Sequence, residues 1–256
     1  MSIKLLQGDC LELMKDIPDD SVDMILADLP YGTTACAWDE IIPFEPLWEQ
    51  YERVIKDSGA IVLTASQPFT SALVMSNPKW FREEVIWLKN KGGSGFQAKQ
   101  KHIKVHESIL VFSKNGKYTF NPQKWLVAEK EFLTQRKTFK EVEVGNNIYG
   151  KMKRTRKKDT GERNPVSIVS ERVPFTPQKN KKYSSDVDLR YHPTQKPVAL
   201  MEYLIKTYTN EGDTVLDNVM GSGTTGVACK ELNRKFVGVE LEENYFNVAK
   251  NRIEGI

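Results

Sequence analysis

The stretch TVLDNVMGSGTTGVA, residues 214–228, constrains the fold of this chain more than any other. An apolar segment leads into Gly221, Gly223 and Gly226, and a segment compatible with a helix follows. Such glycines let the backbone approach a ligand, and the start of the helix offers free N–H groups. Glu240 ends the next predicted strand, 19 residues after Gly221. The pattern predicts a strand–turn–helix–strand unit that binds a nucleotide, with a ligand-free tight turn as the competing interpretation.

Segments of strand and helix character alternate at both ends of the chain. The largely apolar runs 22–27 and 60–65 predict strands that are buried on both faces. Further strands are predicted at residues 3–6, 85–88, 109–112, 214–216 and 235–239, and helices at 10–17, 43–56, 69–75, 197–208, after Gly226, and at 243–252. This alternation predicts an α/β fold with a doubly wound, mostly parallel sheet, in which 85–88 and 109–112 form an antiparallel pair.

Positive charge is concentrated in the middle of the chain. Residues 89–183 carry 23 Lys and Arg against 8 Asp and Glu, although the net charge of the whole chain is only +3. Aromatic residues are interleaved with these cations, a combination that favours a nucleic-acid partner over a merely solvated loop. Regular periodicity fades between about residues 118 and 190. We therefore interpret the basic segment as an insertion into the α/β fold.

Several protein classes are disfavoured by what the sequence lacks. No apolar run reaches the roughly 18 residues of a membrane span. The first ten residues, MSIKLLQGDC, do not resemble a signal peptide, and a cytoplasmic location is expected. The three cysteines, Cys10, Cys36 and Cys229, lack metal-type spacing. Their scatter argues against a zinc site or a disulfide framework.

The charge of Asp217 helps to identify the ligand of the glycine turn. Asp217 stands at the end of the predicted strand, just before the glycines, where it would repel the pyrophosphate of a nicotinamide dinucleotide. A P-loop is excluded because no G-K-[ST] follows the glycines. S-adenosylmethionine fits better, with its cationic groups near Asp217 and its ribose hydroxyls at Glu240. A nicotinamide dehydrogenase is the alternative.

Three motifs together resemble those of a known enzyme family. Asp28-Leu29-Pro30-Tyr31 resembles a catalytic D-P-P-Y motif, residues 217–225 resemble the cofactor loop D-P-F-x-G-S-G-T-T, and residues 192–197 read H-P-T-Q-K-P. In this composition and order the chain resembles an amino DNA methyltransferase of the beta-type, permuted class. The resemblance covers both ends of the chain, about residues 1–115 and 190–254.

The resemblance implies an S-adenosylmethionine-dependent enzyme with a seven-stranded-type methyltransferase sheet. Residues 1–115 and 190–256 would form the catalytic domain, and 116–189 a target-recognition insert. The implied reaction is methylation of adenine N6 in double-stranded DNA, and N4 of cytosine is the alternative. A non-catalytic DNA-binding protein, or methylation of ribosomal RNA or of a protein, remain more remote. A homodimer is compatible with the family, in which many members dimerise.

Catalytic roles follow from the first motif. The exocyclic amine of a base is a poor nucleophile, because its lone pair is delocalised into the ring. The Asp28 carboxylate and the Leu29 carbonyl would accept the two amino hydrogens and make the lone pair available. Pro30 restrains Leu29 to an extended backbone. Tyr31 offers a face on which a flipped-out base can stack.

Cofactor and DNA contacts are predicted from the remaining motifs. The predicted DNA contacts are the cations Lys153, Arg154, Arg156, Lys157 and Lys158 of the insert. Asp9 and Cys10 would lie beside the cofactor adenine, and Lys196 would reach the cofactor carboxylate. The complete set predicted to bind the cofactor is Asp9, Cys10, Thr194, Gln195, Lys196, Asp217, Gly221, Ser222, Gly223, Thr224 and Glu240.

Overall fold

A computed structural model of the protein describes residues 2–34, 36, 39–89, 98–126, 161–170, 191 and 195–255. An eight-stranded sheet crosses the molecule in the order β1-β10-β9-β2-β3-β5-β4-β8. Its strands are β1 (Ile3–Gln7), β2 (Val22–Ala27), β3 (Ile55–Ala65), β4 (Phe81–Leu88), β5 (His106–Phe112), β8 (Ile168–Ser170), β9 (Thr214–Asp217) and β10 (Lys235–Glu240). The first five strands in this order are mutually parallel, and β5 runs antiparallel to both β3 and β4.

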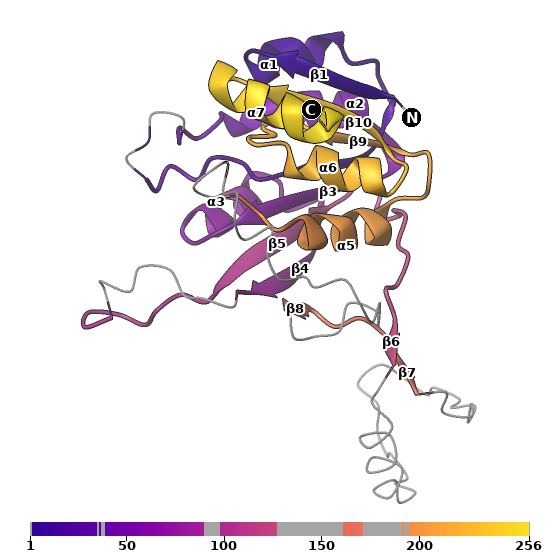
Figure 1. Cartoon of the computed structure of the whole chain (residues 1–256). Coiled ribbons are helices and arrows are strands. Elements are labelled where there is room, and N and C mark those ends of the chain that lie inside the picture. The colour runs from indigo at the N-terminus through magenta and orange to yellow at the C-terminus, as the bar shows by residue number, and fades with distance from the viewer. Residues whose placement is uncertain are drawn as a thin grey trace, which may run out of the picture.

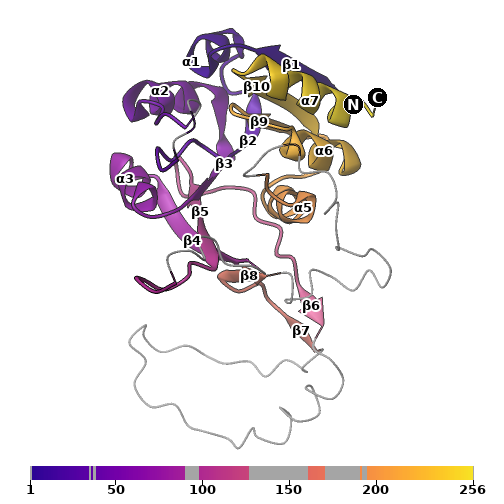
Figure 2. The same cartoon turned by 60° about the vertical axis from the view of Figure 1, so that its left-hand side comes forward.

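Helices cover both faces of the sheet, as Figures 1 and 2 show. One face carries α1 (Cys10–Leu13), α2 (Phe44–Val54) and α3 (Phe69–Ser76), and the other carries α5 (Val198–Tyr208), α6 (Thr224–Glu231) and α7 (Glu243–Glu254). A short 3-10 helix, Met14–Asp16, follows α1. The predicted doubly wound, mostly parallel α/β sheet is therefore confirmed. No helix in the described part of the chain is long and apolar enough to span a bilayer.

Alternate residues of the central strands supply two separate cores. In β2, Ile25 and Ala27 point to the core under α1, α2 and α3, whereas Met24 and Leu26 point to the core under α5, α6 and α7. Because side chains alternate along a strand, a strand between two helical layers must be apolar on both faces. This arrangement explains why the run 22–27 is almost continuously apolar.

Most predicted elements are confirmed, with several boundaries to correct, and β4 and β5 begin at Phe81 and His106 rather than at residues 85 and 109. Helix α2 ends at Val54 rather than at residue 56, and β3 begins at Ile55 rather than at residue 60. The register of β2 and β3 shifts between Val22 and Met24, so the early part of β3 forms a bulge that sequence periodicity does not reveal. Helix α6 begins at Thr224, two residues before Gly226.

Parts of the predicted insert are attached to the α/β body. The edge strand β8 pairs with β4 in parallel and becomes the eighth strand of a sheet for which seven were expected. The Asn121 side chain donates to the carbonyls of Lys206 and Thr209 at the end of α5. A separate two-stranded ribbon joins β6 (Trp125–Leu126) to β7 (Glu162–Arg163). These contacts fix both flanks of the basic segment to the sheet.

Candidate active site

The three predicted site carboxylates stand at the ends of neighbouring parallel strands. Asp28 directly follows β2, Asp217 is the last residue of β9 and Glu240 is the last residue of β10. These strands are adjacent in the sheet and run in the same direction. All three carboxylates therefore lie along the edge formed by the C-terminal ends of the parallel strands, which is where open α/β sheets bind ligands.

The Asp28 carboxylate accepts hydrogen bonds from three side chains. The Tyr31 hydroxyl donates to Oδ1 at 2.7 Å, and the Thr64 hydroxyl donates to the same oxygen. Lys196 Nζ lies 2.5 Å from Oδ2. Asp28 keeps 26% of its side chain exposed, whereas Lys196 keeps only 8%. The carboxylate is thus held in place from behind and remains accessible from the edge of the sheet.

The hydrogen bonds to Asp28 decide its charge. Burial alone would raise the pKa of Asp28, but the ammonium of Lys196 and the hydroxyls of Thr64 and Tyr31 hold this pKa below its usual value. Burial would conversely lower the pKa of Lys196, but Asp28 and Glu107 raise it. Asp28 is therefore an ionised acceptor and Lys196 a cation at neutral pH.

The turn after Asp28 is held by a residue that the sequence reading did not select. The Asp39 carboxylate accepts four backbone N–H groups: Oδ1 from Tyr31 and Gly32 at 2.8 and 2.9 Å, and Oδ2 from Thr33 and Thr34 at 2.9 and 2.6 Å. Each of these groups would otherwise need another partner. Asp39 therefore fixes the backbone that carries Tyr31. In the sequence, only the position of Asp39 shortly after Gly32, Thr33 and Thr34 could have indicated this role.

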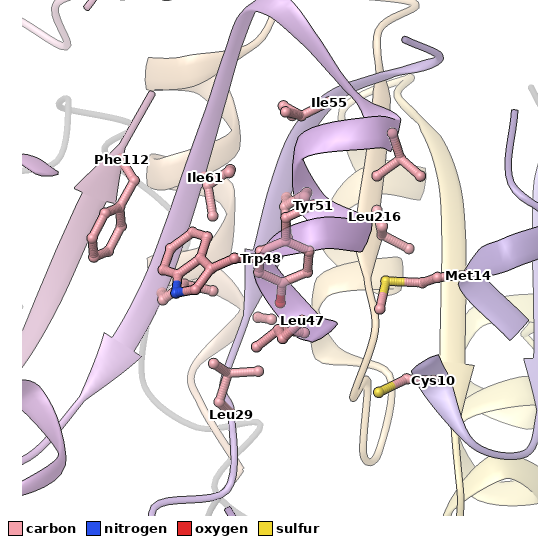
Figure 3. Close-up of a cluster of buried hydrophobic side chains, with 14 of the residues drawn as sticks. Cys10, Met14, Leu29, Leu47, Trp48, Tyr51, Ile55, Ile61, Phe112 and Leu216 are labelled. Atoms are coloured by element: carbon pink, nitrogen blue, oxygen red, sulfur yellow. The ribbon is translucent and has the colours of Figure 1, made fainter. Parts of the chain in front are cut away.

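The second and fourth residues of the D-L-P-Y motif are partly committed to packing. Leu29 is 3% exposed and belongs to the core under α2, where Figure 3 shows it below Leu47 and Trp48. This packing accounts for an apolar leucine at the second position of the motif. The Tyr31 ring stacks on Phe69, with centroids 5.2 Å apart and planes inclined by 24°. Pro30, between Leu29 and Tyr31 in the chain, is half-buried.

The glycine turn has the tight geometry that its sequence predicted. Gly221 and Gly223 have φ of 51° and 80°, the left-handed region that glycine adopts without strain. A Cβ on Gly226 would lie 2.4 Å from Ile253 Cδ1, so this glycine allows α6 to pack closely on α7. Gly221 N donates to Glu240 Oε2 at 2.8 Å. The turn after β9 and the end of β10 therefore form one rigid unit.

Asp217 is buried beside this turn, and no cation pairs with it among the residues that the structure describes. It is 4% exposed, and its Oδ1 accepts the backbone N–H of Val219 at 3.2 Å. Burial raises the pKa of Asp217 to about 7, and hydrogen bonds from Thr225 and Val219 offset only part of this effect. Burial likewise raises the pKa of Glu240. A carboxylate in this state favours binding of a cationic ligand, which would stabilise its ionised form.

Other predicted cofactor residues surround the turn and have structural partners. Gln195 Oε1 accepts from the Ser222 hydroxyl at 3.1 Å, and Arg252 Nη1 donates to the same hydroxyl at 2.9 Å. Thr224 is the first residue of α6 and is buried. This chain of contacts joins the H-P-T-Q-K-P segment to the glycine turn. The two motifs therefore lie side by side in the structure.

The loop after β1 reaches the same region. Asp9 caps α1 by accepting the N–H groups of Leu11 and Glu12 at 2.8 and 3.1 Å. Cys10 is buried, and the Asn218 side-chain amide lies 3.5 Å from its sulfur. Burial raises the pKa of the Cys10 thiol, which argues against a nucleophilic role. Both residues lie next to the Asp217 loop, and contact with the cofactor adenine stays a prediction.

Two groups of predicted residues lie outside the described part of the chain. They are Thr194 of the H-P-T-Q-K-P segment and the cations Lys153, Arg154, Arg156, Lys157 and Lys158. Conversely, Thr64 and Glu107 were not selected from the sequence although they contact Asp28 and Lys196, respectively. Thr64 stands in the otherwise apolar run 60–65, which was its only signal. No cluster of three metal-binding side chains occurs among the residues that the structure describes.

Comparison with proteins of known structure or name places this arrangement in context. The crystal structure of the M1.HpyAVI–SAM complex is similar, with a TM-score of 0.60 and 26% identity over 98% of this chain and 99% of that one. The cytosine-N4-specific PvuII DNA methyltransferase shares the fold, with a TM-score of 0.65 and 16% identity over 98% of this chain and 86% of that one.

Named relatives match over nearly the whole chain. The DNA adenine methyltransferase YhdJ of Escherichia coli is 29% identical over 98% of this chain and 82% of its own length. The type II methyltransferase M.HpaI of Haemophilus parainfluenzae is 28% identical over 99% of this chain and 75% of its own length. A family model described as DNA methylase, for N6 and N4 methyltransferases, matches residues 22–251. Because this match spans most of the chain, the protein belongs to the N6/N4 DNA methylase family.

Proposed function

We propose that this protein transfers a methyl group from S-adenosylmethionine to N6 of adenine in DNA. The observation that carries the proposal is the shared edge of the sheet on which Asp28, Asp217 and Glu240 stand. At this edge, Asp28 can accept from the amine of a base. The neighbouring carboxylates, Asp217 and Glu240, suit a cofactor that carries positive charge and ribose hydroxyls. Similarity to a DNA adenine methyltransferase supports adenine as the target base.

The residues around the glycine turn fit S-adenosylmethionine. When bound, this cofactor supplies an electrophilic methyl group on a sulfonium centre. Asp217, buried and without a cationic partner among the described residues, would interact with its positive charge. Glu240 would accept from the ribose hydroxyls, and Gly221, Ser222, Gly223 and Thr224 would line the turn. Asp9, Cys10, Thr194 and Gln195 complete the proposed contacts.

Asp28 and Leu29 prepare the amine of the base. The Asp28 carboxylate and the Leu29 carbonyl each accept one amino hydrogen, which favours a tetrahedral nitrogen with an available lone pair. The amine nitrogen would gain positive charge as the methyl carbon leaves the sulfonium sulfur, which would keep the electron pair of the broken bond, and the nearby Asp28 carboxylate would stabilise the charge on nitrogen. The surplus proton leaves to water, so that no covalent bond to the protein is needed.

Tyr31 and Pro30 shape the pocket for the base. One face of the Tyr31 ring is stacked on Phe69, which fixes the orientation of the ring. We propose that Tyr31 stacks on the base after the base leaves the duplex, a contact worth about 1–3 kcal/mol in comparable cases. Pro30 limits the backbone freedom of Leu29 and thereby aims its carbonyl.

Motif order and the basic segment define the proposed organisation of the chain. The D-L-P-Y motif precedes the glycine turn, the order of the beta-type class, and D-L-P-Y is taken as its D-P-P-Y variant. Residues 1–115 and 190–256 form the proposed catalytic domain, and 116–189 the proposed target-recognition insert. β8 links that insert to the sheet. We further propose double-stranded DNA as the substrate; a homodimer stays a prediction for sedimentation analysis.

The salt dependence of DNA binding tests the proposed insert. Each phosphate contact contributes a slope of about −0.9 to the log–log plot of affinity against salt for duplex DNA. Neutralising the cations of residues 153–158 should make this slope shallower, as measured by fluorescence anisotropy. An unchanged slope would remove this segment from the DNA interface. The five cations to be replaced together are Lys153, Arg154, Arg156, Lys157 and Lys158.

The target base is tested by labelling. Genomic DNA is incubated with the protein and with S-adenosylmethionine whose methyl group carries an isotope, and the nucleosides are analysed by mass spectrometry. Label in N6-methyladenine is expected. Label only in N4-methylcytosine would correct the target base while leaving the family and the role of Asp28 in place. Absence of label from DNA, with a folded protein that binds the cofactor, would overturn the proposed function.

A further inference from the structure

Behind Asp28, charged side chains form a buried line that the proposed roles do not use. Lys196 Nζ lies 2.5 Å from Asp28 Oδ2 and 3.4 Å from Glu107 Oε2. The side chains of Lys196 and Glu107 are 8% and 13% exposed, so the ammonium meets Glu107 away from bulk water. Lys89 donates to the other oxygen of Glu107, Oε1. Lys196 therefore has two acceptors, and one of them is the proposed acceptor for the base.

The topology explains why Glu107 can reach this position. Ser108 of β5 pairs with Ala65, the last residue of β3. Glu107 thus lies just beyond the end of β3, at the same edge of the sheet as Asp28. The segment that carries Lys196 leads into α5 and crosses this edge. Residues from three distant parts of the chain meet at one ammonium group.

One oxygen of Glu107 has spare capacity to accept. Glu107 Oε2 is buried and makes no hydrogen bond with ordinary geometry to any residue that the structure describes. A buried carboxylate oxygen without a donor is unfavourable for folding, because it loses its hydrogen bonds to water. The Lys196 ammonium lies 3.4 Å from this oxygen and closer to Asp28, so its ion pair with Glu107 is the looser of the two. A small side-chain movement of Lys196 would bring it into hydrogen-bond distance of Glu107 Oε2.

The position of Lys196 is unfavourable for the proposed chemistry. The ammonium occupies Asp28 Oδ2, while the hydroxyls of Tyr31 and Thr64 occupy Oδ1. A cation at this distance also opposes the positive charge that develops on the amine of the base. Asp28 Oδ2 has one further acceptor position beside the ammonium, and it becomes a stronger acceptor for the amine when Lys196 withdraws. Because an unpaired buried charge is strongly unfavourable, Lys196 can withdraw only toward another anion.

We propose, on the basis of the proposed function, that Glu107 is a positioning residue that receives the Lys196 ammonium when the amine of the base reaches Asp28. Lys196 would then move from Asp28 Oδ2 toward Glu107 Oε2, and Asp28 Oδ2 would accept the amino hydrogen. Lys89, paired with the opposite oxygen, keeps Glu107 in place during this exchange. No covalent bond changes in the exchange, and the hydroxyls of Tyr31 and Thr64 continue to donate to Asp28 Oδ1.

Substitution of Glu107 separates this role from folding. Glu107→Gln preserves the size of the side chain and removes its charge. We expect a single-turnover methyl transfer rate about 10- to 100-fold below that of wild type, with cofactor affinity changed by less than about threefold. Glu83→Gln is the matched control. Glu83 lies on the neighbouring strand β4, where it pairs with Val111 whereas Glu107 pairs with Trp87, and it accepts the hydroxyls of Tyr118 and Tyr208.

Several outcomes would overturn the proposal. A wild-type rate for Glu107→Gln would do so, as would an equal loss in the Glu83→Gln control. A parallel loss of cofactor affinity would assign Glu107 to the architecture of the site instead. Glu107→Asp is the second variant, should Glu107→Gln fail to fold. It restores the charge at a shorter reach, and an intermediate rate is expected; the wild-type rate or none above background would count against the role.

Double substitution and a structure of the DNA complex supply independent readouts. If Glu107 acts through Lys196, Lys196→Met together with Glu107→Gln should transfer methyl no more slowly than Lys196→Met alone. Additive losses would exclude this coupling.

In a crystal structure with a cofactor analogue and DNA, Lys196 Nζ should lie closer to Glu107 than to Asp28. Failure of the wild-type protein to methylate DNA would instead refute the proposed function, and leave this exchange without a substrate.

Discussion

Asp28 and Asp217 stand at the ends of adjacent strands but have opposite electrostatic surroundings. Lys196 and two hydroxyls surround Asp28 and hold its pKa below the usual range. No cation pairs with Asp217 in the part of the chain that the structure describes, and burial raises its pKa to about 7. The surroundings thus set the charge of one residue type differently at two neighbouring positions. The protein itself supplies a cation for Asp28, whereas we propose that the ligand supplies one for Asp217.

The turns that follow β2 and β9 are also stabilised in different ways. The turn after β9 relies on Gly221 and Gly223, whose backbone conformations most other residues would adopt only with strain. The turn after β2 relies on the Asp39 carboxylate, which accepts four backbone N–H groups. The turn after β9 is thus fixed by the backbone conformation of its glycines, and the turn after β2 by the hydrogen bonds of one side chain.

Removal of the Asp28 carboxylate should have the largest effect. Asp28→Ala should lower the single-turnover rate of methyl transfer about a hundredfold or more, because an acceptor aimed at developing charge contributes on the order of 3 kcal/mol. Cofactor affinity, measured by calorimetry, should stay within about threefold of wild type. Asp28→Asn controls for side-chain size. Substantial methylation by folded Asp28→Ala would refute the role of this residue and end the comparison.

Neutralising Asp217 should weaken cofactor binding and stabilise the ligand-free protein. Asp217→Asn should lower cofactor affinity about 10- to 100-fold, because the buried charge no longer attracts the cation. A raised carboxylate pKa means that the folded state binds a proton more tightly, so stability falls as pH rises toward 7. At pH 8 the substitution should therefore raise the free energy of unfolding, by about 1–4 kcal/mol.

Denaturant unfolding at pH 8 and pH 5 checks the second part of this expectation. The gain in stability should be large at pH 8 and small at pH 5, where Asp217 of the wild type is protonated and uncharged. Glu240→Ala provides the comparison for the cofactor, since it should weaken binding without removing the charge of Asp217. If Asp217→Asn bound the cofactor as wild type does, the cation would have to interact elsewhere.

Parts of the fold could be predicted because local sequence determines them. The strand at 22–27 was identified with its observed bounds, since burial on both faces leaves an apolar run. β8 was missed, because three residues within a basic segment give too short a pattern to be distinguished. The start of β3 was also missed, because a bulge interrupts its periodicity.

The members of the site were easier to predict than their partners. Asp28, Asp217 and Glu240 were selected because they follow or end predicted strands, and the structure places all three at strand ends. The contact between Lys196 and Asp28 was not predicted, because the two lie 168 residues apart in the sequence and only the folded sheet brings them together. Lys196 was assigned to the cofactor carboxylate, which stays a prediction, whereas the structure places its ammonium on Asp28. Contacts between distant motifs depend on topology, which no local pattern contains.

The pH dependence of cofactor binding should be a smaller effect. Ionised Asp217 binds a cation better than the protonated form, so affinity should fall by up to about tenfold for each pH unit below 7 and level off above about pH 8. Calorimetry in buffers of different ionisation enthalpy should detect release of a proton on binding at pH 6.5. Asp217→Asn should remove most of this dependence, with a remainder from Glu240. A flat profile for wild type would show that Asp217 is already ionised in the free protein.

Tyr31→Phe should have the smallest effect, and it tests whether Lys196 dominates the surroundings of Asp28. The substitution removes one neutral donor to Oδ1, but Thr64 still donates to that oxygen and Lys196 to Oδ2. The ring can still stack on Phe69 and on the base. We expect a single-turnover rate within about threefold of wild type, because a hydrogen bond from a neutral donor contributes little net free energy when others remain. Tyr31→Ala, which also removes the stacking face, should lower the rate further. A hundredfold loss in Tyr31→Phe would mean that the hydroxyl, and not the ammonium, governs Asp28, and the contrast with Asp217 would then rest on hydrogen bonds rather than on an internal cation.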